Sequence, residues 1–163
     1  MDALFPGLQS LLNYHPLFVH FPIALWTAAL LFEIAAHAVP REWTHREMLH
    51  PIACAVLALG ALAAIPTVMS GWSAQAAVPD TGPAHDLKEL HENLMVTASI
   101  LSGILAAVGL FVLPRKPAAM LRAAFLAGLV VLVGLMAVGV DRGAMLVFHY
   151  GTAVDWSSAR KQK

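Results

Sequence analysis

Four long runs of apolar residues constrain this chain more than any other feature. In the 163-residue sequence they cover roughly 17–39, 51–70, 91–113 and 120–140, and only 12% of all residues are charged. A bilayer core about 30 Å thick is crossed by about 20 mostly apolar residues in a helix. Inside a bilayer, backbone groups must pair with one another, and a helix satisfies them within one segment. We therefore predict four transmembrane helices.

Composition supports a membrane protein and excludes several other classes. Hydrophobic residues make up 59% of the chain, against about 45–50% in soluble domains. The formal net charge is +0, so no basic surface suggests nucleic acid as a partner. Cys54 is the single cysteine, which excludes an internal disulfide and the Cys-x-x-Cys-His attachment of a c-type haem. The lipid bilayer is the expected surrounding.

The links between the apolar runs are short. Short links favour antiparallel neighbours, so we expect an all-α, up-down transmembrane four-helix bundle formed by a single domain over 1–163. Gly143 and Gly151 bracket the segment after the fourth run. We expect this segment to fold back as a short interfacial piece, and we expect a polar tail over 151–163.

Basic residues predict the orientation in the membrane. Five of them flank the two links on one side of the bundle: Arg41, Arg46, Arg115, Lys116 and Arg122. The other side has Lys88 and Arg142 near the spans, plus the basic tail. Counted over short loops, the first side is predicted to be cytoplasmic. Both termini would then face the periplasm or exterior of a bacterial inner membrane.

Five of the eight histidines fall on the side of the termini: His15, His20, His85, His91 and His149. Helical phase separates them, because His20 shares a face with Ala24 and Thr27 while His91 shares one with apolar neighbours. Intramembrane ionisable residues are rare and usually functional. We therefore predict that His20 and His91 point inward, that His15 lies at the lip of the site, that His149 lies on a lid, and that His85 faces the wetter side.

Two inward histidines on separate helices suit a b-type haem, whose iron takes two axial imidazoles. Ser102, Thr97 and the carbonyl freed by Pro66 are candidates to orient the imidazoles. The same residues leave a second hypothesis open, in which His15, His20, His91 and His149 bind copper or zinc. A third hypothesis is a non-catalytic assembly subunit whose histidines line a lipid interface.

Recognised catalytic motifs are absent from the sequence, which has no phosphate-binding glycine loop, no His-Glu-x-x-His and no Gly-x-Ser-x-Gly. An electron carrier or binding subunit is therefore expected rather than an enzyme. We interpret His37, His45 and His50 as ordinary interface residues and Cys54 as a packed apolar residue. Glu33 is deep enough in its run to need a partner.

Several of these residues together resemble a family of small bacterial integral-membrane proteins that is catalogued as a domain of unknown function. The pattern begins with His15-Pro16 and Val19-His20-Phe21-Pro22. It continues with Gly71-Trp72, with His91 and Asn93, and then with Gly143 before Val147 and Gly151 before Val154. The resemblance implies a four-helix membrane domain. Relatives joined to Rieske or c-type cytochrome domains imply redox surroundings and a redox partner of that kind. Where many relatives carry an aspartate, this chain reads Gly71-Trp72-Ser73.

Overall fold

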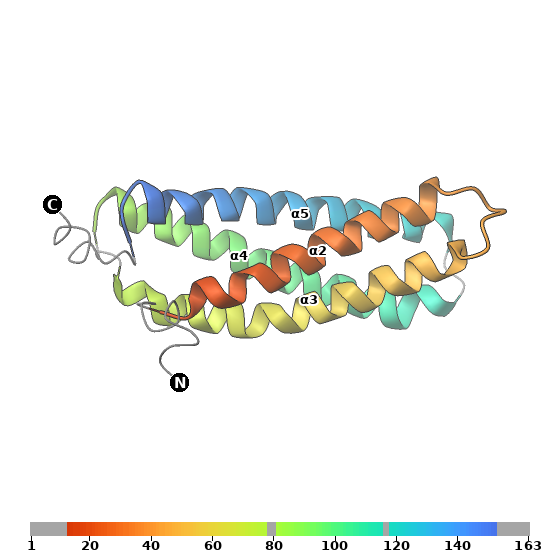
Figure 1. Cartoon of the computed structure of the whole chain (residues 1–163), viewed down its shortest axis with the longest axis horizontal. Coiled ribbons are helices and arrows are strands. Elements are labelled where there is room, and N and C mark those ends of the chain that lie inside the picture. The colour runs from red at the N-terminus through yellow and green to blue at the C-terminus, as the bar shows by residue number, and fades with distance from the viewer. Residues whose placement is uncertain (1–12, 78–80, 116–117, 153–163) are drawn as a thin grey trace, which may run out of the picture.

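The computed structural model describes residues 13–77, 81–115 and 118–152, and every regular element in that part of the chain is a helix. The four long helices are α2 (His15–Ala38), α3 (Arg46–Ala74), α4 (Pro83–Ala107) and α5 (Ala119–Phe148). Three short turns extend them: η1 (Gln75–Ala77) after α3, and the π-helical η2 (Val108–Val112) and η3 (Leu113–Arg115) after α4. Figure 1 shows the helices running side by side along one axis. The all-α prediction is confirmed.

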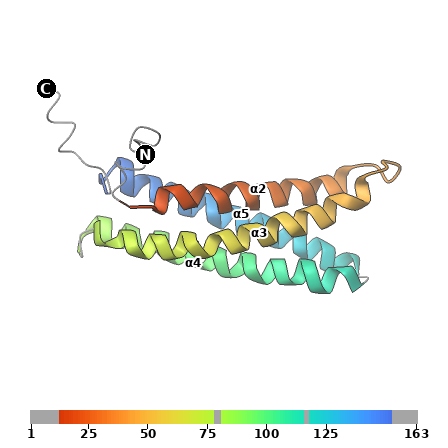
Figure 2. The same cartoon turned by 60° about the horizontal axis from the view of Figure 1, so that its bottom comes forward.

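The helices pack in sequence order as a closed ring. α2 packs on α3, α3 on α4 and α4 on α5, and a contact between α2 and α5 closes the bundle. Consequently α2 and α4 lie diagonally across the bundle, as the turned view in Figure 2 shows. One end of the bundle gathers the start of α2, the end of α3, the start of α4 and the end of α5 (Figure 1). We call it the cavity end, because residues from these four helix ends line a cavity.

The outer surface of the bundle is apolar. Each helical segment from α2 to α5 is long and apolar enough to cross a membrane. Large apolar side chains are exposed along the middle of every one of these segments, among them Leu31, Leu62, Ile65, Ile100, Ile104 and Val131. A soluble protein rarely exposes apolar surface on this scale, whereas a bilayer solvates it. The chain is therefore a multi-pass membrane protein.

The helices are longer than the predicted spans. α3 begins at Arg46 and ends at Ala74, beyond both ends of the predicted 51–70. α5 has 30 residues, or about 45 Å at 1.5 Å per residue, which exceeds the hydrocarbon thickness of about 30 Å. Apolar runs mark where a helix crosses lipid, whereas the helix itself continues while its polar end residues remain in water.

The end of α5 corrects one prediction. The segment after Gly143 does not fold back, because α5 continues without interruption to Phe148. The helix stops at Gly151, which has a φ of 68°, and the Thr152 backbone N–H donates to the Leu146 carbonyl at 3.0 Å. This is the usual helix stop with a left-handed glycine. Gly151 therefore does mark the boundary, but Gly143 lies inside the helix.

Large apolar side chains fill the middle of the bundle. Trp26, Leu57, Phe125, Leu129 and Leu132 are fully buried there, beside the small residues Ala29 and Ala98. Three polar side chains are also buried: Glu33, Thr67 and Ser102. Thr67 ties α3 to α2, because its hydroxyl lies 3.2 Å from the Phe18 carbonyl. This core divides the interior into a cavity at one end and a separate polar cluster towards the other.

Candidate functional site

A cavity of about 500 Å³ opens at the cavity end of the bundle. This size lies within the range of small-molecule and cofactor sites. All four helices line it, and most of the lining is apolar, from residues such as Val19, Ile23, Met95 and Val140. Three of the five histidines predicted for this side also line it, namely His15, His20 and His91. The structure therefore brings together the lip residue and both inward residues of the sequence prediction.

Each of these three imidazoles is held through its Nδ1 atom. The Nδ1 of His20 lies 2.8 Å from the Pro16 carbonyl oxygen, one turn earlier on α2. The Nδ1 of His91 lies 2.7 Å from the Gly139 carbonyl on α5. The Nδ1 of His15 lies 3.1 Å from the Thr67 carbonyl on α3. A backbone carbonyl only accepts hydrogen bonds, so the neutral rings of His20 and His91 carry their proton on Nδ1 and keep a lone pair on Nε2. The Nδ1 of His15 also lies 3.1 Å from the Ser70 hydroxyl, which can donate or accept.

The carbonyl partners differ from the expected ones. Neither Ser102 nor Thr97 orients an imidazole, because the Ser102 hydroxyl donates to the Ser99 carbonyl at 2.7 Å and Thr97 is exposed. The carbonyl that Pro66 frees, that of Leu62, is not one of the partners either. The carbonyls of Pro16, Thr67 and Gly139 serve instead, two of them on a neighbouring helix. Sequence reasoning could not identify them, since every residue offers a carbonyl and only the packing of α3 and α5 decides which one faces a ring.

Two of the histidine rings pack directly against glycines. A Cβ atom added to Gly71 would lie 3.1 Å from Cε1 of His15, and one added to Gly143 would lie 2.9 Å from Cε1 of His91. Both distances are shorter than ordinary van der Waals contact. Gly71 and Gly143 also belong to the pattern by which the chain resembles its family. Their physical role here is to leave room for an imidazole of another helix.

Gly143→Ala is expected to displace the His91 ring without removing it. The added methyl overlaps Cε1 of His91, so the ring must turn away from the Gly139 carbonyl. Loss of an orienting partner commonly weakens a metal or cofactor site about 10–100-fold. For haem, the cofactor that the sequence predicts here, we expect the affinity to fall by that much in a titration of the purified protein followed by absorption. Gly134→Ala is the control, because nothing lies within 4 Å of that position. Equal affinity in the two variants would contradict the packing role.

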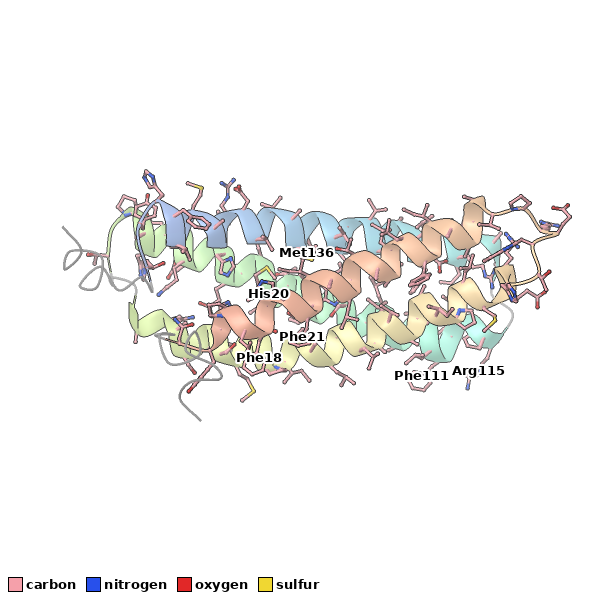
Figure 3. All side chains as sticks on the ribbon, viewed as in Figure 1. Phe18, His20, Phe21, Phe111, Arg115 and Met136 are labelled. Atoms are coloured by element: carbon pink, nitrogen blue, oxygen red, sulfur yellow. The ribbon has the colours of Figure 1, made fainter. Side chains whose placement is uncertain are left out.

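His20 occupies an exposed part of the cavity wall. Figure 3 shows it on the side of α2 towards α4 and α5, with Phe18 and Phe21 on the other side in that view. Of the three histidines predicted to lie outside the inner pair, His15 lines the cavity, whereas His85 and His149 do not. His149 is exposed and does not line the cavity, and since α5 does not fold back, it forms no lid. The Nε2 of His85 lies 3.3 Å from the carboxylate of Glu89, one turn later on α4.

Polar side chains at the cavity are few, and one of them lacks a partner. Glu92 accepts hydrogen bonds from Trp72 at 2.8 Å and from Gln75 at 2.7 Å, which links the ends of α3 and α4. Lys88 contributes a positive charge to the lining. Trp26 lies deeper, fully buried, and its indole Nε1 has no hydrogen-bond partner. Buried polar groups are normally satisfied, so this N–H is a donor without an acceptor.

The metal hypothesis needs three or more ligands in one place. Within 13–77, 81–115 and 118–152, no group of three His, Cys, Asp or Glu side chains lies close enough to hold one metal ion. The cavity instead presents imidazoles on diagonally opposed helices, His15 and His20 on α2 and His91 on α4.

Sequence reasoning missed a second cluster of polar residues. Glu33 is fully buried, and its Oε2 lies 2.6 Å from Nδ1 of His50. The Nε2 atom of His50 lies 3.5 Å from Sγ of Cys54. The partner that Glu33 was predicted to need is therefore His50, which was interpreted as an ordinary interface residue. The predicted antiparallel hairpin could have indicated this contact, because Glu33 and His50 lie at similar distances from the link between α2 and α3.

The comparisons with known proteins agree with this architecture. No curated protein and no solved structure gives a significant match to the chain. One family model, described as a predicted membrane protein (DUF2231), matches residues 12–156. This match covers nearly all of the described chain, including the four helices and the histidine cavity. The chain therefore belongs to the DUF2231 family of predicted membrane proteins.

Proposed function

We propose that this integral-membrane protein binds a b-type haem in the cavity and carries electrons. One observation carries the proposal: three imidazoles line a single, mostly apolar cavity from diagonally opposed helices, and those of His20 and His91 keep a lone pair on Nε2. Two imidazoles of this kind could hold the iron of a b-type haem, and an apolar interior suits the macrocycle. We assign the iron to His20 on α2 and His91 on α4, with His15 beside them.

The residues present suit haem in their chemistry. The Nδ1–H bonds of His20 and His91 to carbonyls are the second contact that commonly fixes a ligating imidazole and raises its basicity. Lys88 offers a cation for an acidic substituent of the ligand. Bound haem would supply a one-electron redox centre. The protein would hold the ring, exclude water through its apolar walls, and set the electronic properties of the site through the two carbonyls.

The distribution of basic residues supports an outward-facing site. Arg41, Arg46, Arg115 and Arg122 lie at the end opposite the cavity, whereas Lys88 and Arg142 lie at the cavity end. Positive charge gathers on the cytoplasmic side of membrane proteins. The cavity would then face the periplasm of a bacterial inner membrane, and a Rieske or c-type cytochrome protein would be a suitable electron partner there.

Absorption spectroscopy tests the proposal. Protein purified after expression with sufficient haem should show a Soret band at close to one haem per chain. His91→Ala and His20→Ala should lose most of that band, because each removes an iron ligand. His149→Ala and His45→Ala should retain it, since both residues are exposed and neither lines the cavity.

Two results would contradict the proposal. One is wild-type protein without haem despite sufficient supply. The other is an unchanged band in both His20→Ala and His91→Ala. Metal analysis of the same haem-free protein would then distinguish copper or zinc binding from an assembly subunit without a cofactor, because only copper or zinc binding depends on His15, His20 and His91.

A further inference from the structure

The polar cluster of Glu33, His50 and Cys54 lies outside the cavity. Glu33 is on α2, one turn before His37, while His50 and Cys54 are one turn apart on α3. None of the four residues lines the cavity. Lipid and protein interiors disfavour ionisable groups, and those that do occur there commonly take part in binding or proton transfer. The cluster therefore requires its own explanation, independent of the haem proposal.

The charge partner of Glu33 is a group that can itself gain or lose a proton. Within the described ranges, Glu33 forms ion-pair contacts only with the imidazoles of His50 and His37, at 2.6 and 3.6 Å, and none with an arginine or lysine. The guanidinium of Arg46, one turn before His50, donates instead to the Val39 carbonyl at 2.9 Å. A permanent cation would fix the carboxylate in its charged form. An imidazole makes the charge of the pair depend on the number of bound protons.

The geometry also offers a position for an additional proton. Glu33 Oε1 is buried and accepts no hydrogen bond, and the Nδ1 of His37 donates to the Glu33 backbone carbonyl at 2.9 Å instead. A buried carboxylate oxygen without a donor is costly. Protonating it converts Oε1 into a hydroxyl and removes the negative charge. The Nδ1 of His37 lies 3.6 Å from Oε1, and the His37 side chain is 41% exposed, against 14% for His50.

The remaining contacts of the Glu33–His50 pair and of Cys54 come from residues of α3, α5 and η2. On α3, the Nε2 of His50 contacts Sγ of Cys54 at 3.5 Å. From α5, the ring of Phe125 packs edge-on against His50 with ring centroids 5.7 Å apart. In the π-helical turn η2, Gly109 packs against Sγ of Cys54. Phe125 and Gly109 do not titrate, so His37 and Cys54 are the titratable groups that contact the pair.

We infer that Glu33 and His50 form a buried proton-binding site of the bundle, on the far side of the core from the cavity. The pair shares one proton along the line from Oε2 to Nδ1. It takes up or releases a second one at Oε1 of Glu33 or Nε2 of His50, in exchange with water by way of His37. The ligand of this site is the proton itself, which needs hydrogen-bonded partners and no space for a larger ligand.

Spectroscopy on the full chain in lipid nanodiscs tests this inference. Histidine labelled with ¹⁵N reports the protonation of His50 by NMR, and glutamate labelled with ¹³C reports the carboxyl group of Glu33 by infrared absorption, from about pH 5 to about pH 10. We expect both signals to change in one shared transition. In Glu33→Gln, the pH of the His50 transition should move by at least about one unit, a tenfold change in proton affinity.

The control variant removes a carboxylate that does not contact His50. Glu47→Gln changes an exposed carboxylate at the start of α3 and should leave the His50 transition in place. If Glu33→Gln fails to fold, the wild-type protein still tests the inference, because the protonation of both His50 and Glu33 is measured in it. Signals of Glu33 and His50 that stay constant over the whole range would overturn the inference. So would a His50 transition at the same pH in wild type and in Glu33→Gln. Neither measurement depends on bound haem.

Discussion

His50→Leu is expected to destabilise the bundle by about 3–5 kcal/mol, which is typical when one partner of a buried ion pair is removed. The substitution leaves Glu33 with both carboxylate oxygens unpaired in the interior, because Oε1 already lacks a donor and Oε2 loses its contact with His50. The edge-on contact between His50 and Phe125 is also lost. The loss can be measured as the free energy of unfolding in a detergent–denaturant titration followed by circular dichroism.

A double substitution separates the buried charge from the lost packing. In Glu33→Leu combined with His50→Leu, neither charge remains, and replacing a buried pair by apolar residues is often neutral or even stabilising. We expect the double variant to be clearly more stable than His50→Leu alone. His45→Leu controls for removing a histidine at the same end, since His45 is exposed. Equal stability of the single and double variants would show that the pair contributes only packing.

The helices and their order could be predicted from the sequence because bilayer thickness and backbone pairing leave few alternatives. Helical phase also placed His20 and His91 on the cavity, since a period of 3.6 residues fixes which face a side chain occupies. His149 was misplaced for a local reason. Gly143 suggested a break after the fourth run, but a glycine inside a membrane helix can equally make room for a neighbouring ring, as it does for His91.

Contacts between residues of neighbouring helices could not be predicted as well as the order of the helices. The phase of one helix does not say which residue of its neighbour lies opposite, so the pairing of Glu33 with His50 was missed. The same limit hid the carbonyls that orient the imidazoles. Antiparallel hairpins do carry a usable register, because residues at similar distances from the link face one another. Trp26 with Gly60 and Phe18 with Thr67 follow that register, as does Glu33 with His50.

Gly60→Ala is expected to weaken the bundle near the upper end of the about 1–3 kcal/mol that overpacking usually costs. An added Cβ atom would lie 2.6 Å from Cδ1 and 2.9 Å from Nε1 of Trp26, and 3.1 Å from Cβ of Leu25. Trp26 is fully buried, and Cβ of Leu25 is attached to the α2 backbone and cannot turn away. The methyl therefore forces α2 and α3 apart at the pair of helices with the most extensive contact.

A double-mutant cycle shows whether Trp26 is the cause. Trp26→Leu removes the indole, so adding Gly60→Ala in that background should change the unfolding free energy little, and the interaction energy should fall within the about 0.5–3 kcal/mol of contacting residues. Gly134→Ala, with open space around it, should leave stability unchanged or slightly higher, because alanine favours the helix. If Gly60→Ala cost no more than Gly134→Ala, close approach of α2 and α3 at Gly60 would not be what holds them together. If the cost persisted without the indole, the clash would lie with Leu25 instead.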